Sequence, residues 1–253
     1  SSLESQLNGI WYSDKPPPWY LRLVEHGYAG FIQRRKPISS KTMQVPVVVI
    51  GNFTVGGTGK TPLIIAIVRH LQRIGRKPGV ISRGYGRIGN AAYALNGQST
   101  ADESGDEPLL IYRRTQVPVQ VDTDRLAAAE KLIADGCDVI VSDDGLQHHK
   151  LPRQLEIEVF DAARGYGNGH LLPAGPLRET PRPVDFRIGN GQIGDSASAF
   201  GMQLVFGKCY RLHDGFEKSL TAFEGEKVQV IAGIGNPGRF FKALTDTGLT
   251  INE

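Results

Sequence analysis

Short apolar runs alternate along this chain with stretches in which apolar residues recur every three or four positions. The apolar runs are Val45–Ile50, Gly79–Ser82, Val117–Val121, Cys137–Ser142 and Glu156–Phe160. The helical period follows Lys60 and appears again over 124–134, where Thr123 supplies a capping hydroxyl. Buried strands alternating with amphipathic helices are typical of a parallel sheet covered by helices, so the pattern predicts an α/β fold.

The composition changes after Pro183. Residues 189–198 are rich in glycine and small polar side chains, and the runs Met202–Phe206 and Lys208–Leu212 predict a hairpin or a pair of linker strands. A strand at Val228–Ala232 and a helix from Arg239 follow, in a remainder of about 35 residues that is too short for a core of its own. This remainder either packs on the first domain or begins a second domain that the chain does not complete. We therefore expect a main domain at 37–198, a two-stranded linker at 199–218 and the start of a second domain at 219–253.

A phosphate-binding loop follows the first predicted strand. Its small residues are Gly56, Gly57, Thr58 and Gly59. They let successive backbone N–H groups face phosphate oxygens, while Lys60 can reach the β- and γ-phosphates of ATP and the Thr61 hydroxyl can bind Mg²⁺. The general pattern has glycine six residues before the lysine, and this chain has Thr54 there. A glycine-rich turn with no ligand is the alternative, but the order of strand, loop and helix favours phosphate binding.

A pair of carboxylates, Asp143 and Asp144, follows the apolar run that ends at Ser142. Acidic residues at the carboxyl end of a parallel strand face the crevice where open α/β sheets bind ligands. One carboxylate can bind the Mg²⁺ held by Thr61, while its neighbour points to the opposite face. A plain Asp-Asp-Gly turn is the alternative, and the phosphate loop upstream favours the metal site. His148, further along the same loop, is a weak signal by itself.

Three further polar residues are candidates for a functional role only if other observations support that role. Asp106 opens a predicted helix, where a capping role satisfies the local pattern. Arg83 and Arg178 stand beside glycines or prolines in predicted loops, where a guanidinium can clamp phosphate. Loop arginines without a ligand are the commoner case.

The N-terminal segment, residues 1–36, contains an amphipathic stripe. The stripe consists of Trp19, Tyr20, Leu23, Val24, Tyr28, Phe31 and Ile32. Arg22, Glu25 and Gln33 lie off the stripe, and the basic residues 34–36 follow it. A helix of this kind can lie in the headgroup plane of a membrane and bind anionic lipid. The alternative is a helix packed on its own domain.

Composition excludes several classes of protein. The chain has 253 residues, of which 40% are hydrophobic, and its formal net charge of +3 is too small to indicate a nucleic-acid partner. Cys137 and Cys209 lack metal-ligand spacing, which favours buried thiols in a reducing compartment. No apolar stretch approaches the roughly 20 residues of a membrane-spanning helix. We expect a cytoplasmic protein that reaches a membrane peripherally.

Together these segments resemble the tetraacyldisaccharide 4'-kinases, the lipid A kinases of bacterial outer-membrane assembly. The segments that match, in the family's order, are Ile10–Tyr12, Gly51–Pro62, Ser82–Gly86, Gly105–Pro108, Asp143–His148, Gly175–Glu179 and Ala232–Pro237. Thr54 is itself a feature of this family. The resemblance implies transfer of the γ-phosphoryl group of ATP to the 4'-hydroxyl of a tetraacylated glucosamine disaccharide 1-phosphate, at the cytoplasmic face of the inner membrane. It also implies a P-loop NTPase-like sheet with flanking helices, a two-stranded linker and a smaller second α/β domain.

The resemblance also implies roles for individual residues. Lys60 and Thr61 would bind ATP and Mg²⁺, Asp144 would be the metal carboxylate with Asp143 assisting, and Asp106 would act on the acceptor hydroxyl. The residues implied in substrate or nucleotide positioning are Arg83, Tyr85, His148, Arg178 and Glu179. Family members continue to a histidine that pairs with the catalytic aspartate, and this chain ends at Glu253 before it.

Two other classes fit part of the pattern. A membrane-associated switch ATPase or GTPase would share the phosphate loop, but the chain lacks an Asn-Lys-x-Asp guanine signature, and Val55 stands where partitioning ATPases have a signature lysine. A non-catalytic membrane-binding module would require the loop to be vestigial, although Lys60, Thr61 and the acidic pair are intact.

Overall fold

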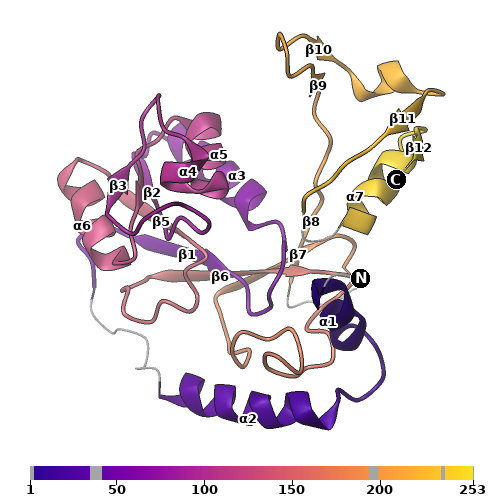
Figure 1. Ribbon diagram of the computed structural model, residues 1–253. Coiled ribbons are helices and arrows are strands. Elements are labelled where there is room, and N and C mark those ends of the chain that lie inside the picture. Colours follow the sequence, from indigo (N-terminus) through magenta and orange to yellow (C-terminus); the bar gives the residue numbers. More distant parts are fainter. Residues whose placement is uncertain (1–2, 35–41, 194–198, 235–236, 253) are drawn as a thin grey trace. The chain divides into compact units, whose positions relative to one another are not determined.

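The structure is a computed structural model that describes residues 3–34, 42–193, 199–234 and 237–252 (Figure 1). The chain forms two compact units. The first comprises residues 1–55 and 59–202, and the second comprises 56–58 and 203–253. Among the described residues, no helix is long and apolar enough to span a membrane.

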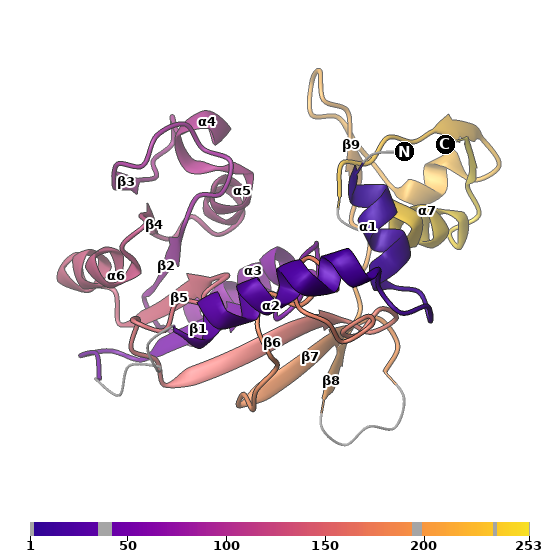
Figure 2. The same ribbon diagram turned by 60° about the horizontal axis from the view of Figure 1, so that its bottom comes forward.

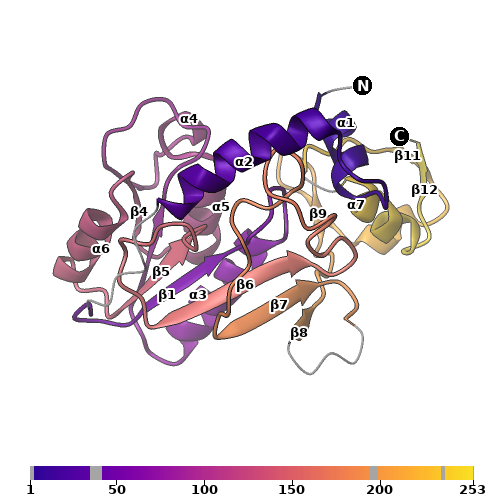
Figure 3. The ribbon, with the colours of Figure 1, turned by 90° about the horizontal axis from the view of Figure 1, so that it is seen from below.

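The first unit is built on one twisted sheet. Its strands are β1 (Val47–Gly51), β2 (Pro78–Ser82), β3 (Tyr93–Ala94), β4 (Val119–Val121), β5 (Val139–Asp143), β6 (Leu155–Asp161), β7 (Phe186–Asn190) and β8 (Phe200–Met202). Their order across the sheet is β3-β4-β2-β5-β1-β6-β7-β8. Each neighbouring pair is parallel except β3 and β4, and Figure 3 shows β6 and β7 running in the same direction. The predicted α/β fold is therefore confirmed.

Helices cover both faces of this sheet because successive strand residues point to opposite sides. The helices of the unit are α1 (Leu3–Trp11), α2 (Trp19–Gln33), α3 (Lys60–Arg73), α4 (Ala101–Ser104), α5 (Asp106–Thr115) and α6 (Arg125–Ala134). On one face, buried side chains of α3 and α5 join Ile50 and Val141 in a single core. On the other face, α6 packs in a core that contains Val49 and Ile140. Neighbouring residues of β1 and β5 thus belong to opposite layers.

Two details of the first unit differ from the sequence predictions. The N-cap of α6 is Asp124, whose carboxylate accepts hydrogen bonds from the backbone N–H groups of Leu126 at 3.0 Å and Ala127 at 3.1 Å. The prediction of Thr123 as the cap is wrong, because the carboxylate one residue later meets the free N–H groups. Strand β7 lies in a region where only a change of composition was noted. Its last two residues, Gly189 and Asn190, have the composition of a loop, yet they are buried in a strand that pairs with β6.

The second unit contains short elements. They are β9 (Cys209–Tyr210), β10 (Glu217–Lys218), a 3-10 helix at Leu220–Phe223, β11 (Lys227–Gln229), α7 (Pro237–Thr245) and β12 (Thr250–Asn252). β9 pairs antiparallel with β10, and β11 pairs parallel with β12. The expected pairing of 202–206 with 208–212 does not form, since Met202 ends β8 in the main sheet. Asp214 and Gly215 instead turn the chain after β9, where Gly215 has φ 73° and the Asp214 carboxylate accepts from the Phe216 N–H.

Candidate active site

The carboxyl ends of the central strands lie along one edge of the sheet. Ile50 of β1 is in register with Asp143 of β5, and Ile81 of β2 is in register with Ser142. The loops that leave these strands therefore begin side by side, at the edge where open α/β sheets bind ligands. Three segments singled out from the sequence, Gly51–Pro62, Ser82–Gly86 and Asp143–His148, begin at this edge.

The phosphate loop runs from the end of β1 at Gly51 to the start of α3 at Lys60. Its last residue before the helix, Gly59, has φ 97°, which an L side chain rarely adopts. A Cβ at this position would also lie 2.4 Å from Nδ2 of Asn190. Gly59 is thus required by backbone conformation and by space, and it places the N-terminus of α3 at the open edge.

Two cationic side chains converge on Asp144. Nη1 of Arg178 donates to both carboxylate oxygens, at 2.8 and 2.9 Å, and Nζ of Lys60 lies 3.6 Å from Oδ1. Lys60 also donates to Oδ1 of Asn52 at 2.9 Å, and its side chain is only 11% exposed. Burial would raise the pKa of Asp144, but Lys60 and then Arg178 outweigh it and hold this pKa below its ordinary value. The group of Asn52, Lys60, Asp144 and Arg178 carries one net positive charge, which suits an anionic ligand.

Asp143 and Asp144 are neighbours in different surroundings. Asp144 has φ 48°, so the chain turns sharply as β5 ends. Asp143 is 1% exposed; its Oδ2 accepts from the Ser82 hydroxyl at 2.8 Å, and Arg125 donates to its carbonyl oxygen at 2.6 Å. Its Oδ1 is buried without a hydrogen-bond partner in the described part of the chain. Burial raises the pKa of Asp143, and the attraction of Lys60 reduces this increase without cancelling it.

These oxygen donors fit Mg²⁺. The described residues contain no group of three or more acidic, histidine or cysteine side chains that could enclose a metal ion. Mg²⁺ is ordinarily held by one or two carboxylates together with substrate phosphates, rather than by a protein cage. The unbonded Oδ1 of Asp143, the carboxylate of Asp144 and the hydroxyl of Thr61 are hard ligands of the kind that Mg²⁺ requires.

The segment that carries Asp106 packs directly against the loop after β2. A Cβ on Gly105 would lie 2.8 Å from the carbonyl oxygen of Tyr85, and one on Gly84 would lie 2.8 Å from that of Ser104. The two backbones can approach this closely because both positions are glycine. The structure therefore brings together the Arg83–Tyr85 loop and the start of α5, and Arg83, Tyr85 and Asp106 are all exposed.

Sequence reasoning missed Glu107. This residue stays accessible to solvent, yet partial burial of its carboxyl group, followed by the charge of Asp143, raises its pKa, while Lys60 opposes the increase. Glu107 thus shares the electrostatic field of the Lys60 site. The available signal was its place beside Asp106 in the Gly-Asp-Glu-Pro segment.

Gln147 and Asn52 were also missed. Gln147 Nε2 donates to the carbonyl oxygen of Asn52 and to Oε1 of Glu179, each at 3.0 Å. Glu179 is buried, and its Oε2 lies 3.4 Å from Nε2 of His149. Gln147 therefore joins the Asp143–His149 loop to the start of the phosphate loop and to the segment after Arg178.

His148 is held in its neutral form. Burial, followed by the charges of Arg125 and Arg153, lowers its pKa to about 4. Its carbonyl oxygen accepts a hydrogen bond from Arg153. At neutral pH this imidazole can donate or accept a hydrogen bond but carries no charge.

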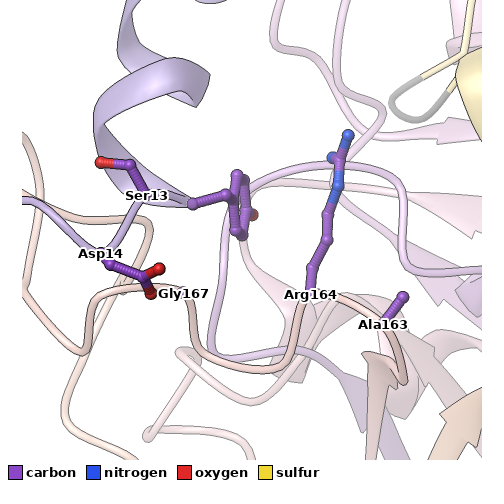
Figure 4. Close-up of a pocket in the computed structure, with 6 residues that line it drawn as sticks. Ser13, Asp14, Ala163, Arg164 and Gly167 are labelled. Atoms are coloured by element: carbon purple, nitrogen blue, oxygen red, sulfur yellow. The ribbon is translucent and has the colours of Figure 1, made fainter.

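A separate hollow lies beside α1. It has a volume of about 190 Å³ and is lined by Tyr12, Ser13, Asp14, Ala163, Arg164 and Gly167 (Figure 4). The guanidinium of Arg164 lies 4.9 Å from the centre of the Tyr12 ring. None of the residues predicted for phosphate or metal binding lines this hollow.

The fold and the site define a P-loop nucleotide-binding protein: a mainly parallel sheet, a glycine loop entering a helix at Lys60, and an acidic pair at the end of the neighbouring strand. A family model described as tetraacyldisaccharide-1-P 4'-kinase matches residues 18–253. The chain belongs to this family.

Similar proteins agree with this membership. The chain is 46% identical to a tetraacyldisaccharide 4'-kinase of Stenotrophomonas maltophilia (strain R551-3), over 98% of the chain and 78% of that protein. It is 44% identical to one from Xylella fastidiosa (strain M23), over 98% of the chain and 78% of that protein. A crystal structure of LpxK from Aquifex aeolicus in complex with ATP matches with a TM-score of 0.73 at 26% identity, over 100% of the chain and 81% of that protein.

Proposed function

We propose that this chain is an ATP-dependent lipid kinase of lipid A biosynthesis. It transfers the γ-phosphoryl group of ATP to the 4'-hydroxyl of a tetraacylated glucosamine disaccharide 1-phosphate. The observation that carries this function is the convergence of Lys60 and Arg178 on Asp144 at the phosphate loop, in a chain of the tetraacyldisaccharide-1-P 4'-kinase family.

Lys60 and Arg178 stabilise charge in this proposal. Phosphoryl transfer develops negative charge on the transferred group and the leaving phosphate, and preorganised cations stabilise that charge. The Lys60 side chain is 11% exposed and donates to Asn52, so its ammonium group is held in the site before the nucleotide binds. Arg178 remains 27% exposed and can leave Asp144 for a phosphate oxygen.

Thr61, Asp143 and Asp144 would hold Mg²⁺. When bound, the ion would supply charge neutralisation between the β- and γ-phosphates. Asp143 supports this assignment through its buried, unbonded oxygen, and Asp144 through a pKa that keeps it ionised.

Asp106 accepts the proton of the acceptor hydroxyl. It stands exposed at the first turn of α5, beside Glu107, whose pKa responds to Asp143 and Lys60. Arg83 and Tyr85 lie on the loop packed against this turn, where they can contact the disaccharide phosphate. His148 and Glu179 complete the substrate-binding set from the adjoining loops.

Helix α2 binds the membrane surface in which the lipid substrate lies. Its exposed apolar side chains are Trp19, Tyr20, Leu23, Val24 and Phe31, with exposed fractions from 53% to 74%. A helix with this face can lie in the headgroup region, which leaves the acyl chains of the substrate in the bilayer. Residues 35 and 36 of the predicted basic cluster lie outside the described residues. We infer a peripheral location on the cytoplasmic face of the inner membrane.

A transfer assay tests the function. The chain is incubated with γ-labelled ATP, Mg²⁺ and the disaccharide 1-phosphate in mixed micelles, and label is followed into lipid and into free phosphate. Label on the lipid supports the kinase. Phosphate release independent of lipid supports a switch ATPase and overturns the proposal, as does the absence of both reactions, which supports a binding module.

A further inference from the structure

Helix α2 has a second, polar face that is not part of its apolar stripe. Tyr28 was predicted to belong to the stripe and Glu25 to lie off it; both side chains are half-buried, and each hydrogen-bonds to another segment of the chain. They are three residues apart and so lie on the same side of the helix. Figures 2 and 3 show α2 running beside the loop between β6 and β7, which is the loop they contact.

Tyr28 and Glu25 bind the two ends of one segment, residues 170–178. The Tyr28 hydroxyl donates to the carbonyl oxygen of Arg178 at 2.9 Å. At the other end, Oε1 of Glu25 accepts from the Leu171 N–H at 2.8 Å, and Oε2 lies 3.0 Å from Nδ1 of His170. The Glu25 side chain is only 14% exposed, so this contact is shielded from water.

The 170–178 segment is internally braced. The Leu177 N–H donates to the His170 carbonyl at 3.1 Å, and the Leu172 N–H donates back to the Leu177 carbonyl at 2.9 Å. The Gly175 N–H closes a further turn on the Leu171 carbonyl at 2.9 Å. A displacement at one end of this closed loop is therefore passed to the other end.

The same segment is bonded to the start of the phosphate loop. The Arg178 N–H donates to the Phe53 carbonyl at 2.7 Å, and the Val55 N–H donates to the Pro176 carbonyl at 2.9 Å. The segment thus lies between α2 and the phosphate loop. Side chains of α2 hydrogen-bond to it, and its backbone hydrogen-bonds to the start of the phosphate loop. Arg178 reaches Asp144 from this position.

We infer that Tyr28 and Glu25 are positioning residues for Arg178. They fix the backbone from which its guanidinium reaches the phosphate site, so α2 contributes to phosphoryl transfer as well as to lipid binding. This inference rests on the proposed kinase function. A displacement of about 1 Å in a positioned catalytic group can cost about 10²-fold in rate, which makes the backbone anchor of a long side chain consequential.

Tyr28→Phe tests the inference because it removes one hydroxyl and keeps the ring. We expect kcat to fall about 10-fold and the Kd for ATP to rise, while the melting temperature and flotation with anionic vesicles stay at wild-type values. Tyr93→Phe is the matched control: its hydroxyl lies 2.9 Å from the Ser99 hydroxyl, at a comparably part-buried site on β3. If Tyr28→Phe matches Tyr93→Phe in kcat and ATP affinity, the inference is overturned.

Glu25 provides a rescue test. Glu25→Gln keeps an oxygen acceptor for the Leu171 N–H, whereas Glu25→Ala removes it. We expect the alanine variant to lose activity as Tyr28→Phe does and the glutamine variant to retain most of it. Equal losses in both would contradict a role based on this hydrogen bond.

A double-mutant cycle with Arg178 separates positioning from a general packing role. If Tyr28 acts through Arg178, adding Tyr28→Phe to Arg178→Ala produces no further loss of kcat, whereas independent effects multiply. Multiplying effects would overturn the inference. The Kd for ATP, measured without lipid, keeps this test separate from the proposed function. Absence of lipid labelling by the wild type would refute the kinase function. A Kd for ATP unaltered by Tyr28→Phe would refute the positioning role.

Discussion

Nη1 of Arg178 donates to both carboxylate oxygens of Asp144, although the two residues are 34 positions apart in the sequence. Lys60 approaches the same carboxylate from α3. Phosphates of a nucleotide would compete with Asp144 for both cations. The net positive charge of this group favours binding of an anionic ligand.

Lys60→Ala should lower kcat/KM by at least about 10²-fold, the scale for losing one preorganised charge-stabilising group. Folding should change little, because the side chain lies at the first turn of α3 and contacts the polar groups of Asn52 and Asp144 rather than the apolar core. Steady-state transfer kinetics and circular dichroism measure the two effects. Lys131→Ala is the control and should be neutral, because the Lys131 side chain on α6 is 53% exposed. Near-normal transfer by Lys60→Ala would refute the kinase assignment.

Asp144→Asn and Asp106→Asn should have different kinetic signatures. If Asp144 holds Mg²⁺, its replacement weakens MgATP binding and raises the Mg²⁺ concentration needed for half-maximal rate. If Asp106 accepts the hydroxyl proton, its replacement mainly lowers kcat. Titration of Mg²⁺ at saturating lipid distinguishes the two. Identical profiles with unaltered Mg²⁺ dependence would show that the roles are wrongly assigned.

His148 should make the stability of the protein depend on pH. Its pKa is lowered from 6.5 to about 4 in the folded chain, so between these values the unfolded chain binds a proton that the folded chain does not. The contribution of His148 to the free energy of unfolding is therefore complete above pH 6.5 and decreases as the pH falls toward 4. Urea unfolding at pH 7.5 and pH 5 measures the free energy of unfolding. Its decrease between these two pH values should be smaller for His148→Gln than for the wild type. An unchanged difference between the two pH values would contradict this.

Leu23→Asp combined with Phe31→Asp should weaken binding to anionic vesicles and raise the apparent KM for lipid, with ATP affinity unchanged. Both side chains are 64% exposed, so the substitutions remove interfacial contacts rather than core contacts. Leu212→Asp with Ile231→Asp, at residues 92% and 91% exposed in the second unit, is the control.

Flotation with anionic vesicles measures membrane binding of each variant. Binding of the wild type should decrease as the salt concentration rises, because salt screens the attraction between the basic flank and the anionic lipid. Flotation of the α2 variant equal to that of the wild type, or unfolding of the variant, would refute the interfacial role of this helix.

Local order along the chain was sufficient to predict the sheet class and the phosphate loop. Lys60 and Thr61 open an amphipathic helix that follows a buried strand, and each of these elements leaves its own period in the sequence. Asp143 and Asp144 end a continuous apolar strand in the same way. By contrast, β7 contains Gly189 and Asn190, which gave it the composition of a loop.

The sequence by itself determined which residues end the strands of this protein, and therefore which side chains could meet at the edge of a parallel sheet. Only the tertiary structure decided which of them pair. The pairing of Arg178 with Asp144 and the influence of Lys60 on Glu107 depend on the position of β5 beside β1. The hydrogen bond from Tyr28 to the carbonyl of Arg178, 150 residues away, depends on the packing of the 170–178 segment against α2. The physical reason is that a residue's period along the chain reports which face of its element is buried, whereas its partner across that face is set by the packing of distant elements.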